Sequence, residues 1–128
     1  MKLSNIQPTQ LYISSEKLSK ILHGMKAKIA FHEPVPIKEL NGKIIYTDGH
    51  TRALATYLQG GDDIDVCWED EKLDWDEYQV CVDWCLAEGI RTIADLSGRI
   101  IDPESYQTLW LDRCGKMHED IENRRKGL

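Results

Sequence analysis

The sequence contains no apolar run long enough to cross a membrane, and no apolar segment near its first residues that resembles a signal peptide. It also lacks an excess of basic residues, because the net charge is -6 and Arg124–Lys126 forms only a short basic cluster. Direct binding of nucleic acid needs a basic surface that neutralises phosphates, so it is not expected here. We therefore expect a cytoplasmic protein with no membrane partner.

The cysteines lack the spacing of a metal-binding or disulfide framework. Cys81 and Cys85 are four residues apart and could share a helix face, where two thiolates would supply half of a zinc site. The valine and tryptophan residues around Cys67, Cys81 and Cys85 favour packing instead. We expect reduced cysteines in the core, Cys114 included, and no resident metal site.

Aromatic residues are also few, but all four tryptophans fall in the second half of the chain. Without interleaved basic residues, Trp68, Trp75, Trp84 and Trp110 are better explained as core residues than as base-stacking residues, with Trp84 a candidate for a partner surface. Nine of the sixteen residues from 62 to 77 are acidic. We interpret that stretch as solvated surface and as acids that favour a helix N-terminus, rather than as a metal site.

The first half of the sequence alternates between helix and strand patterns. A helix is predicted from Ser15 to about Leu22, and strands are predicted over 37–40, 43–47 and 64–68. Asn41-Gly42 predicts a hairpin between the first two strands, and apolar spacing from Ala53 predicts a helix that ends at Gly60-Gly61. This order indicates an α/β (α+β) domain, which we assign to residues 1–69.

The second half has the pattern of an all-helical C-terminal extension, residues 70–128. Asp74 followed by Glu77 predicts a capped helix that stops near Gly89. Thr92 with Asp95 predicts a short capped turn, and Asp102-Pro103 predicts the start of the last helix.

The most informative stretch is Asp48-Gly49-His50-Thr51-Arg52, between a predicted strand and a predicted helix. Backbone N–H groups and the helix dipole at such a point favour an anion. Gly49 allows close approach, Thr51 adds a hydroxyl, and Arg52 can hold two phosphate oxygens. His50 can donate to phosphate or move a proton, and Asp48 can bind magnesium, hold a neighbouring base or accept a proton. The alternative without a ligand is a capped turn with surface side chains.

The loop and its surroundings resemble the ParB/sulfiredoxin fold family, in particular its ParB N-terminal domains. The residues that carry the resemblance span about 4–68 and comprise Leu11-Tyr12-Ile13-Ser14-Ser15-Glu16-Lys17-Leu18, Pro36-Ile37-Lys38-Glu39-Leu40-Asn41-Gly42 and Asp48-Gly49-His50-Thr51-Arg52-Ala53-Leu54-Ala55. The resemblance implies a small mixed sheet with helices, in which the loop and the next helix bind nucleotide phosphates. It also brings His32 toward the loop, although a surface position is the simpler interpretation.

Departures from the family pattern narrow the expected chemistry. Sulfiredoxins have a catalytic cysteine where this chain has His50, so reduction of cysteine sulfinic acid is not expected. The CTP-hydrolysing partition proteins have a glutamate and arginines where this chain has His50, Thr51 and Leu54, and their helix-turn-helix is not evident here. The loop resembles that of the ADP-dependent free-serine kinase branch. That resemblance implies a glutamate of the first helix as base, for which Glu16 is the candidate.

Together these observations predict a ParB-like nucleotide- or phosphate-binding domain, with ATP, ADP or CTP and magnesium as the expected ligands. Phosphoryl transfer or nucleotide hydrolysis is the candidate activity, with Glu16, Asp48 and His50 as catalytic residues and Gly49, His50, Thr51 and Arg52 as ligand-binding residues. The alternative is a non-enzymatic regulatory or interaction module. Its helical half would bind another protein or a second copy.

Overall fold

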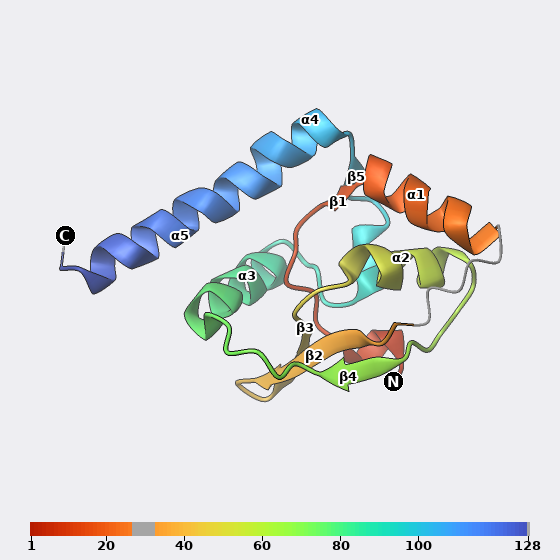
Figure 1. Cartoon of the computed structure of the whole chain (residues 1–128), viewed down its shortest axis with the longest axis horizontal. Coiled ribbons are helices and arrows are strands. Elements are labelled where there is room, and N and C mark those ends of the chain that lie inside the picture. Colours follow the sequence, from red (N-terminus) through yellow and green to blue (C-terminus); the bar gives the residue numbers. More distant parts are fainter. Residues whose placement is uncertain (27–32, 128) are drawn as a thin grey trace.

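The structure is a computed structural model that describes residues 1–26 and 33–127. His32 lies outside the described residues. The chain has mixed α and β content, as predicted, with a three-stranded sheet at one side and helices around and beyond it (Figure 1). No described helix is long and apolar enough to cross a membrane.

The main sheet contains the hairpin that precedes the loop. Strand β2 (Val35–Leu40) pairs antiparallel with β3 (Lys43–Tyr46) and parallel with β4 (Val66–Trp68), so the order is β3-β2-β4. Asn41 and Gly42 join β2 to β3 with φ values of 50° and 81°, which confirms the predicted turn. Residue Gln7 bridges Ile45 of β3, so the N-terminal segment lies beside this edge of the sheet.

The helices of the first half are α1 (Ser15–Lys26) and α2 (His50–Leu58). Helix α1 continues past the predicted end near Leu22, because Gly24 is accommodated inside the helix, where it is buried. Helix α2 begins at His50, within the Asp48–Arg52 loop, and lies between α1 and the sheet (Figure 1).

The second half is helical except for one short strand. It contains α3 (Trp75–Ala87), a 3₁₀ turn (Ile93–Leu96), α4 (Pro103–Tyr106) and α5 (Asp112–Arg125). The predicted caps are present: Asp74 accepts a hydrogen bond from the Glu77 N–H at 3.3 Å, and Thr92 with Asp95 forms a capping box. The prediction of an all-helical extension was wrong at β5 (Ile100–Ile101), which pairs parallel with β1 (Ile13–Ser14).

Helices α4 and α5 form one continuous rod, joined by a π-helical turn over Gln107–Leu111 (Figure 1). The rod is held to the rest of the molecule at its far end, where the Arg125 guanidinium contacts Asp74 at 2.8 Å and Asp76 at 3.0 Å. In its middle, Trp110 packs edge-on against Trp84 of α3, with ring centroids 6.1 Å apart. Trp84, predicted to mark a partner surface, therefore contributes to packing within the chain.

The buried apolar side chains form one cluster that draws on both halves of the chain, from Leu3 to Ile121. The division at residue 70 therefore does not separate two cores. Three predicted core residues are outside the cluster: Cys67 is exposed, 62% of Trp68 is exposed, and Trp75 is only partly buried. Cys67 and Trp68 lie on β4, which is an edge strand of the main sheet.

Candidate functional site

The loop after β3 is shaped by one glycine and by contacts from both sides. Gly49 has φ 82°, and a methyl group there would lie 3.0 Å from Cγ1 of Val35 and 3.1 Å from Nη2 of Arg52. Only glycine tolerates both the positive φ and these close contacts without strain. The Gly49 N–H donates to the Asp48 carboxylate at 2.7 Å. Gly49 therefore allows β2 and Arg52 to approach the loop, while the approach to a phosphate stays a prediction.

Helix α2 starts with free backbone donors. Its first bonded N–H belongs to Ala53, which donates to the Gly49 carbonyl at 3.0 Å, and no side chain caps the helix. The N–H groups of His50, Thr51 and Arg52 make no hydrogen bond to the described residues. Such donors at a helix N-terminus favour an anion.

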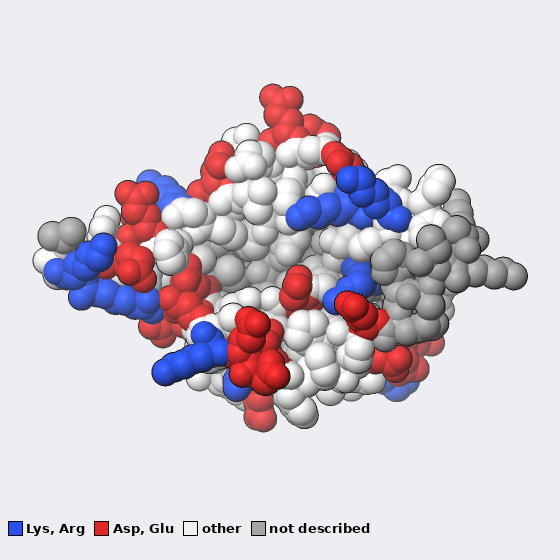
Figure 2. Space-filling view, viewed as in Figure 1, with Lys and Arg blue, Asp and Glu red and all other residues white. Residues whose placement is uncertain are grey.

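A cavity of about 380 Å³ lies beside this helix start, between the loop and α1. Lys17 and Lys20 of α1 line it together with residues 48–52. The Lys17 ammonium lies 5.2 Å from the centre of the Tyr106 ring, which also lines the cavity. Figure 2 shows basic side chains gathered over α1 beside a hollowed surface, whereas the surface toward α3 is mainly acidic and the end of α5 carries both signs of charge. This cavity is therefore a positively charged site on an acidic protein.

Arg52 is partly committed to the fold. Its Nη1 donates to the Glu33 carbonyl at 2.8 Å, which holds the guanidinium next to Gly49. One of the Arg52 nitrogens is therefore already engaged with the backbone, so fewer of its N–H groups are available to a phosphate than predicted.

His50 has a different environment from the one predicted. It is 5% exposed, and its Nε2 lies 2.9 Å from the backbone nitrogen of Thr9, which donates to it. Its ring lies 5.0 Å from the Tyr46 ring. Burial lowers the pKa of His50 to about 4, although the nearby Asp48 carboxylate acts in the opposite direction. This environment fits neither a surface histidine, as in the alternative without a ligand, nor a proton carrier near neutral pH.

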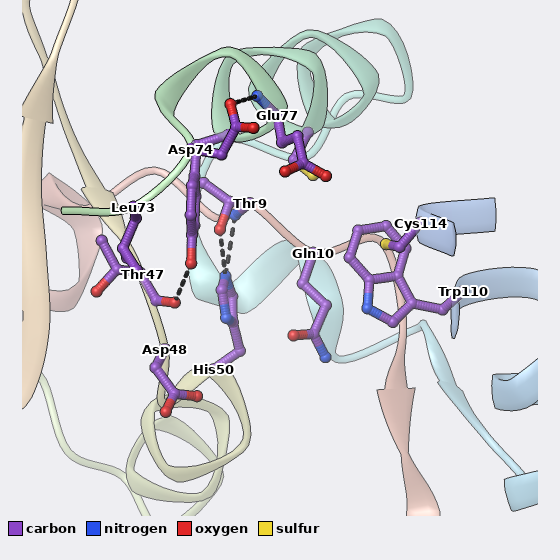
Figure 3. Close-up of a pocket in the computed structure, with 12 residues that line it drawn as sticks. Thr9, Gln10, Thr47, Asp48, His50, Leu73, Asp74, Glu77, Trp110 and Cys114 are labelled. Atoms are coloured by element: carbon purple, nitrogen blue, oxygen red, sulfur yellow. Dashed lines mark hydrogen bonds between the residues drawn. The ribbon is translucent and has the colours of Figure 1, made fainter. Parts of the chain in front are cut away.

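A second cavity, also about 380 Å³, adjoins the first and shares Gln10, Asp48 and His50 with it. Its walls come from the loop, α3 and the α4–α5 rod (Figure 3). Tyr78 of α3 donates to the Thr47 carbonyl at 2.8 Å and so fixes α3 over the start of the loop. Trp110 of the π-helical turn also lines this cavity. π-Helical turns are frequent at functional sites.

Two cysteine thiols lie in the wall of this second cavity. The Cys114 thiol raises the pKa of Cys81 far above the ordinary value, and burial adds to the effect. The Cys81 thiol in turn lowers the pKa of Cys114. No group of three or more potential metal ligands occurs among residues 1–26 and 33–127.

Not every predicted site residue comes together. Asp48, Gly49, His50, Thr51 and Arg52 all line the cavity beside α1. Glu16 does not line either cavity; its carboxylate is exposed and pairs with Lys20 at 3.1 Å.

Sequence reasoning missed several residues that line the site, among them Lys17, Lys20 and Trp110, and also Thr9, Gln10 and Tyr106. The two lysines are three residues apart on a predicted helix, so they share a face, and that spacing was a usable signal. The position of Trp110 had no comparable signal, because it depends on the π-helical turn.

Comparisons with known proteins add evidence about the fold only. No model of a known protein family matches this chain, and a search of curated proteins finds no match. Among solved structures, the chain is similar to protein Atu1540 from Agrobacterium tumefaciens, with 16% sequence identity and a TM-score of 0.50. The match covers 85% of this chain and 63% of that protein, so the chain spans less than two thirds of its length. Because the shared part is larger than residues 4–68, the similarity extends into the helical half.

Proposed function

We propose that this protein binds a phosphate-bearing small molecule, with a nucleotide as the first candidate, in the cavity beside the Asp48–Arg52 loop. One observation carries the proposal: free N–H groups at the start of α2 lie beside the same cavity as Lys17, Lys20 and Arg52. An anion in this cavity would meet helix donors and positive charge together.

The adjoining cavity supports a ligand larger than inorganic phosphate. Each cavity lies within the size range of small-molecule sites, roughly 300–1,000 Å³. The second cavity offers the Trp110 ring and Leu73 beside the polar groups of Thr9 and Thr47. We assign the phosphate to the cavity beside α1 and the organic part of the ligand, such as a nucleoside, to the cavity beside α3 and α5.

The arrangement supports binding better than it supports phosphoryl transfer. Glu16 is outside both cavities, and His50 is a weak base whose Nε2 already accepts from the Thr9 N–H, so neither is placed as a general base. Asp48 is the carboxylate shared by the two cavities among the described residues. In an enzymatic version it would hold magnesium together with nucleotide phosphates, or accept the proton of an acceptor hydroxyl. These positions favour the non-enzymatic module as the simpler version of the proposal.

A thermal-shift panel tests the proposal. Wild type, Arg52→Ala and Lys43→Ala are each titrated with ATP, ADP, CTP, GTP and inorganic phosphate, with and without magnesium. Lys43 is the matched control, because it is an exposed cation that does not line either cavity. We expect at least one ligand to raise the Tm of wild type and Lys43→Ala, and Arg52→Ala to need about tenfold more ligand. If no ligand raises the Tm of wild type, the proposal is wrong. Phosphate release by a ligand-bound wild type would favour the enzymatic version.

A further inference from the structure

The hydrogen bonds around His50 determine which ring nitrogen carries its proton. The Thr9 backbone N–H can only donate, so Nε2, at 2.9 Å, accepts and is unprotonated (Figure 3). The Thr9 hydroxyl lies 3.3 Å from the same nitrogen, but its hydrogen goes to the Tyr46 carbonyl at 2.8 Å. The neutral ring therefore carries its proton on Nδ1.

The Nδ1–H group is a donor in need of an acceptor. No described residue accepts a hydrogen bond from it, although only 5% of His50 is exposed. Nδ1 is not among the fully buried atoms without a partner, so its N–H reaches the cavity surface, where water or a ligand can accept its hydrogen. His50 lines both cavities, at the place where they adjoin.

We propose that His50 is a specificity-determining residue whose Nδ1–H donates a hydrogen bond to an unprotonated phosphate or phosphate-ester oxygen of the ligand, where the two cavities adjoin. The proposal rests on the proposed function, because it names the contact that orients the same ligand. It also assigns Thr9 as a positioning residue, since the Thr9 N–H holds the ring in the donating tautomer. A ligand that presents an ammonium or N–H group at this point would be rejected, because two donors would face each other.

The surrounding groups fit this role. The Nδ1–H supplies a fixed neutral donor, while the positive charge for the phosphate comes from Lys17, Lys20 and Arg52. Asp48 adds a negative charge at the same place, so a magnesium ion or the lysines must offset it when a phosphate binds. A neutral donor at this buried position costs less free energy than a further cation would.

Two variants separate the two ring nitrogens. His50→Gln keeps an amide oxygen that can accept from the Thr9 N–H, but it has no donor at the Nδ1 position. His50→Asn keeps a donor near the Nδ1 position and loses the acceptor for Thr9. We expect His50→Gln to weaken the binding of inorganic phosphate and of ADP about tenfold, which is the effect of one lost hydrogen bond to a charged oxygen. We expect His50→Asn to retain most of the affinity for both probes.

Nitrogen-15 NMR of wild type gives a readout that does not depend on either variant. We expect the His50 ring to be protonated at Nδ1 and unprotonated at Nε2 at pH 7, and the Nδ1–H signal to move when phosphate is added. A proton on Nε2, or wild-type affinity in His50→Gln, would overturn the assignment even if phosphate binds. If wild type binds neither phosphate nor ADP, the proposed function fails, and this inference fails with it.

Discussion

Mild acid should destabilise this protein through His50. The pKa of His50 falls from an ordinary value of 6.5 to about 4 in the folded chain, because burial disfavours the charged ring and the nearby Asp48 carboxylate only partly opposes this effect. Between these two values the unfolded chain binds a proton that the folded chain does not bind. Stability is therefore lost as pH falls below 6.5, and the loss is complete below about pH 4.

The size of the effect follows from the two pKa values. Each pKa unit between the folded and unfolded states corresponds to about 1.4 kcal/mol. The full contribution of His50 is therefore about 3 kcal/mol, and about 2 kcal/mol of it is lost between pH 7 and pH 5. The lowered pKa values of Asp95 and Asp102 act below this window, since the ordinary value of an aspartate is 3.8.

Urea unfolding followed by tryptophan fluorescence at pH 7, 6 and 5 measures this loss. His50→Gln is the comparison, because it keeps an acceptor for Thr9 and does not titrate in this range. Histidines elsewhere in the chain contribute equally to both proteins, so they cancel in the difference. We expect wild type to lose about 2 kcal/mol more than His50→Gln between pH 7 and pH 5. Equal losses in the two proteins would refute the buried, neutral state of His50.

Three further substitutions test the loop and its surroundings. Gly49→Ala should lower the free energy of unfolding by about 2 kcal/mol, which is more than the effect of Gly42→Ala. Both glycines have positive φ, but only at position 49 would the added methyl group also be in close contact with its neighbours. Equal losses in urea unfolding would contradict the close contact. Tyr46→Phe should be neutral or stabilising by up to about 1 kcal/mol, because it removes a buried hydroxyl without a partner in the described structure; a large loss of Tm would mean that the hydroxyl is satisfied. Glu16→Gln should leave phosphate affinity unchanged or raise it about twofold, because it releases Lys20 from an exposed ion pair; weaker binding by calorimetry would restore Glu16 to the site.

Local signals in the sequence predicted the hairpin, the loop and the helix caps. Asn41-Gly42 and the caps at Asp74 and Thr92 act within a few residues, so their geometry depends little on the rest of the chain. The parallel pairing of β1 with β5 could not be predicted in this way. It joins Ile13 to Ile100, and each strand has only two residues.

The composition of the site was predicted less well than its position. The loop residues were identified, but the role of His50 depends on Thr9, which lies 41 residues earlier in the chain. A histidine at a helix start carries no local signal of burial. The resemblance implied Glu16 of the first helix, whereas Lys17 and Lys20 of the same helix are the residues that line the cavity.

The central claim is that a phosphate binds at the start of α2, and backbone amide NMR during a titration with inorganic phosphate tests it most directly. Arg124–Lys126 is the competing basic cluster, and its Arg125 is already engaged with Asp74 and Asp76. We predict saturable shifts of the amides of His50, Thr51 and Arg52, with smaller changes at the C-terminal cluster. Shifts confined to Arg124–Lys126, or no saturable shifts at all, would contradict the claim.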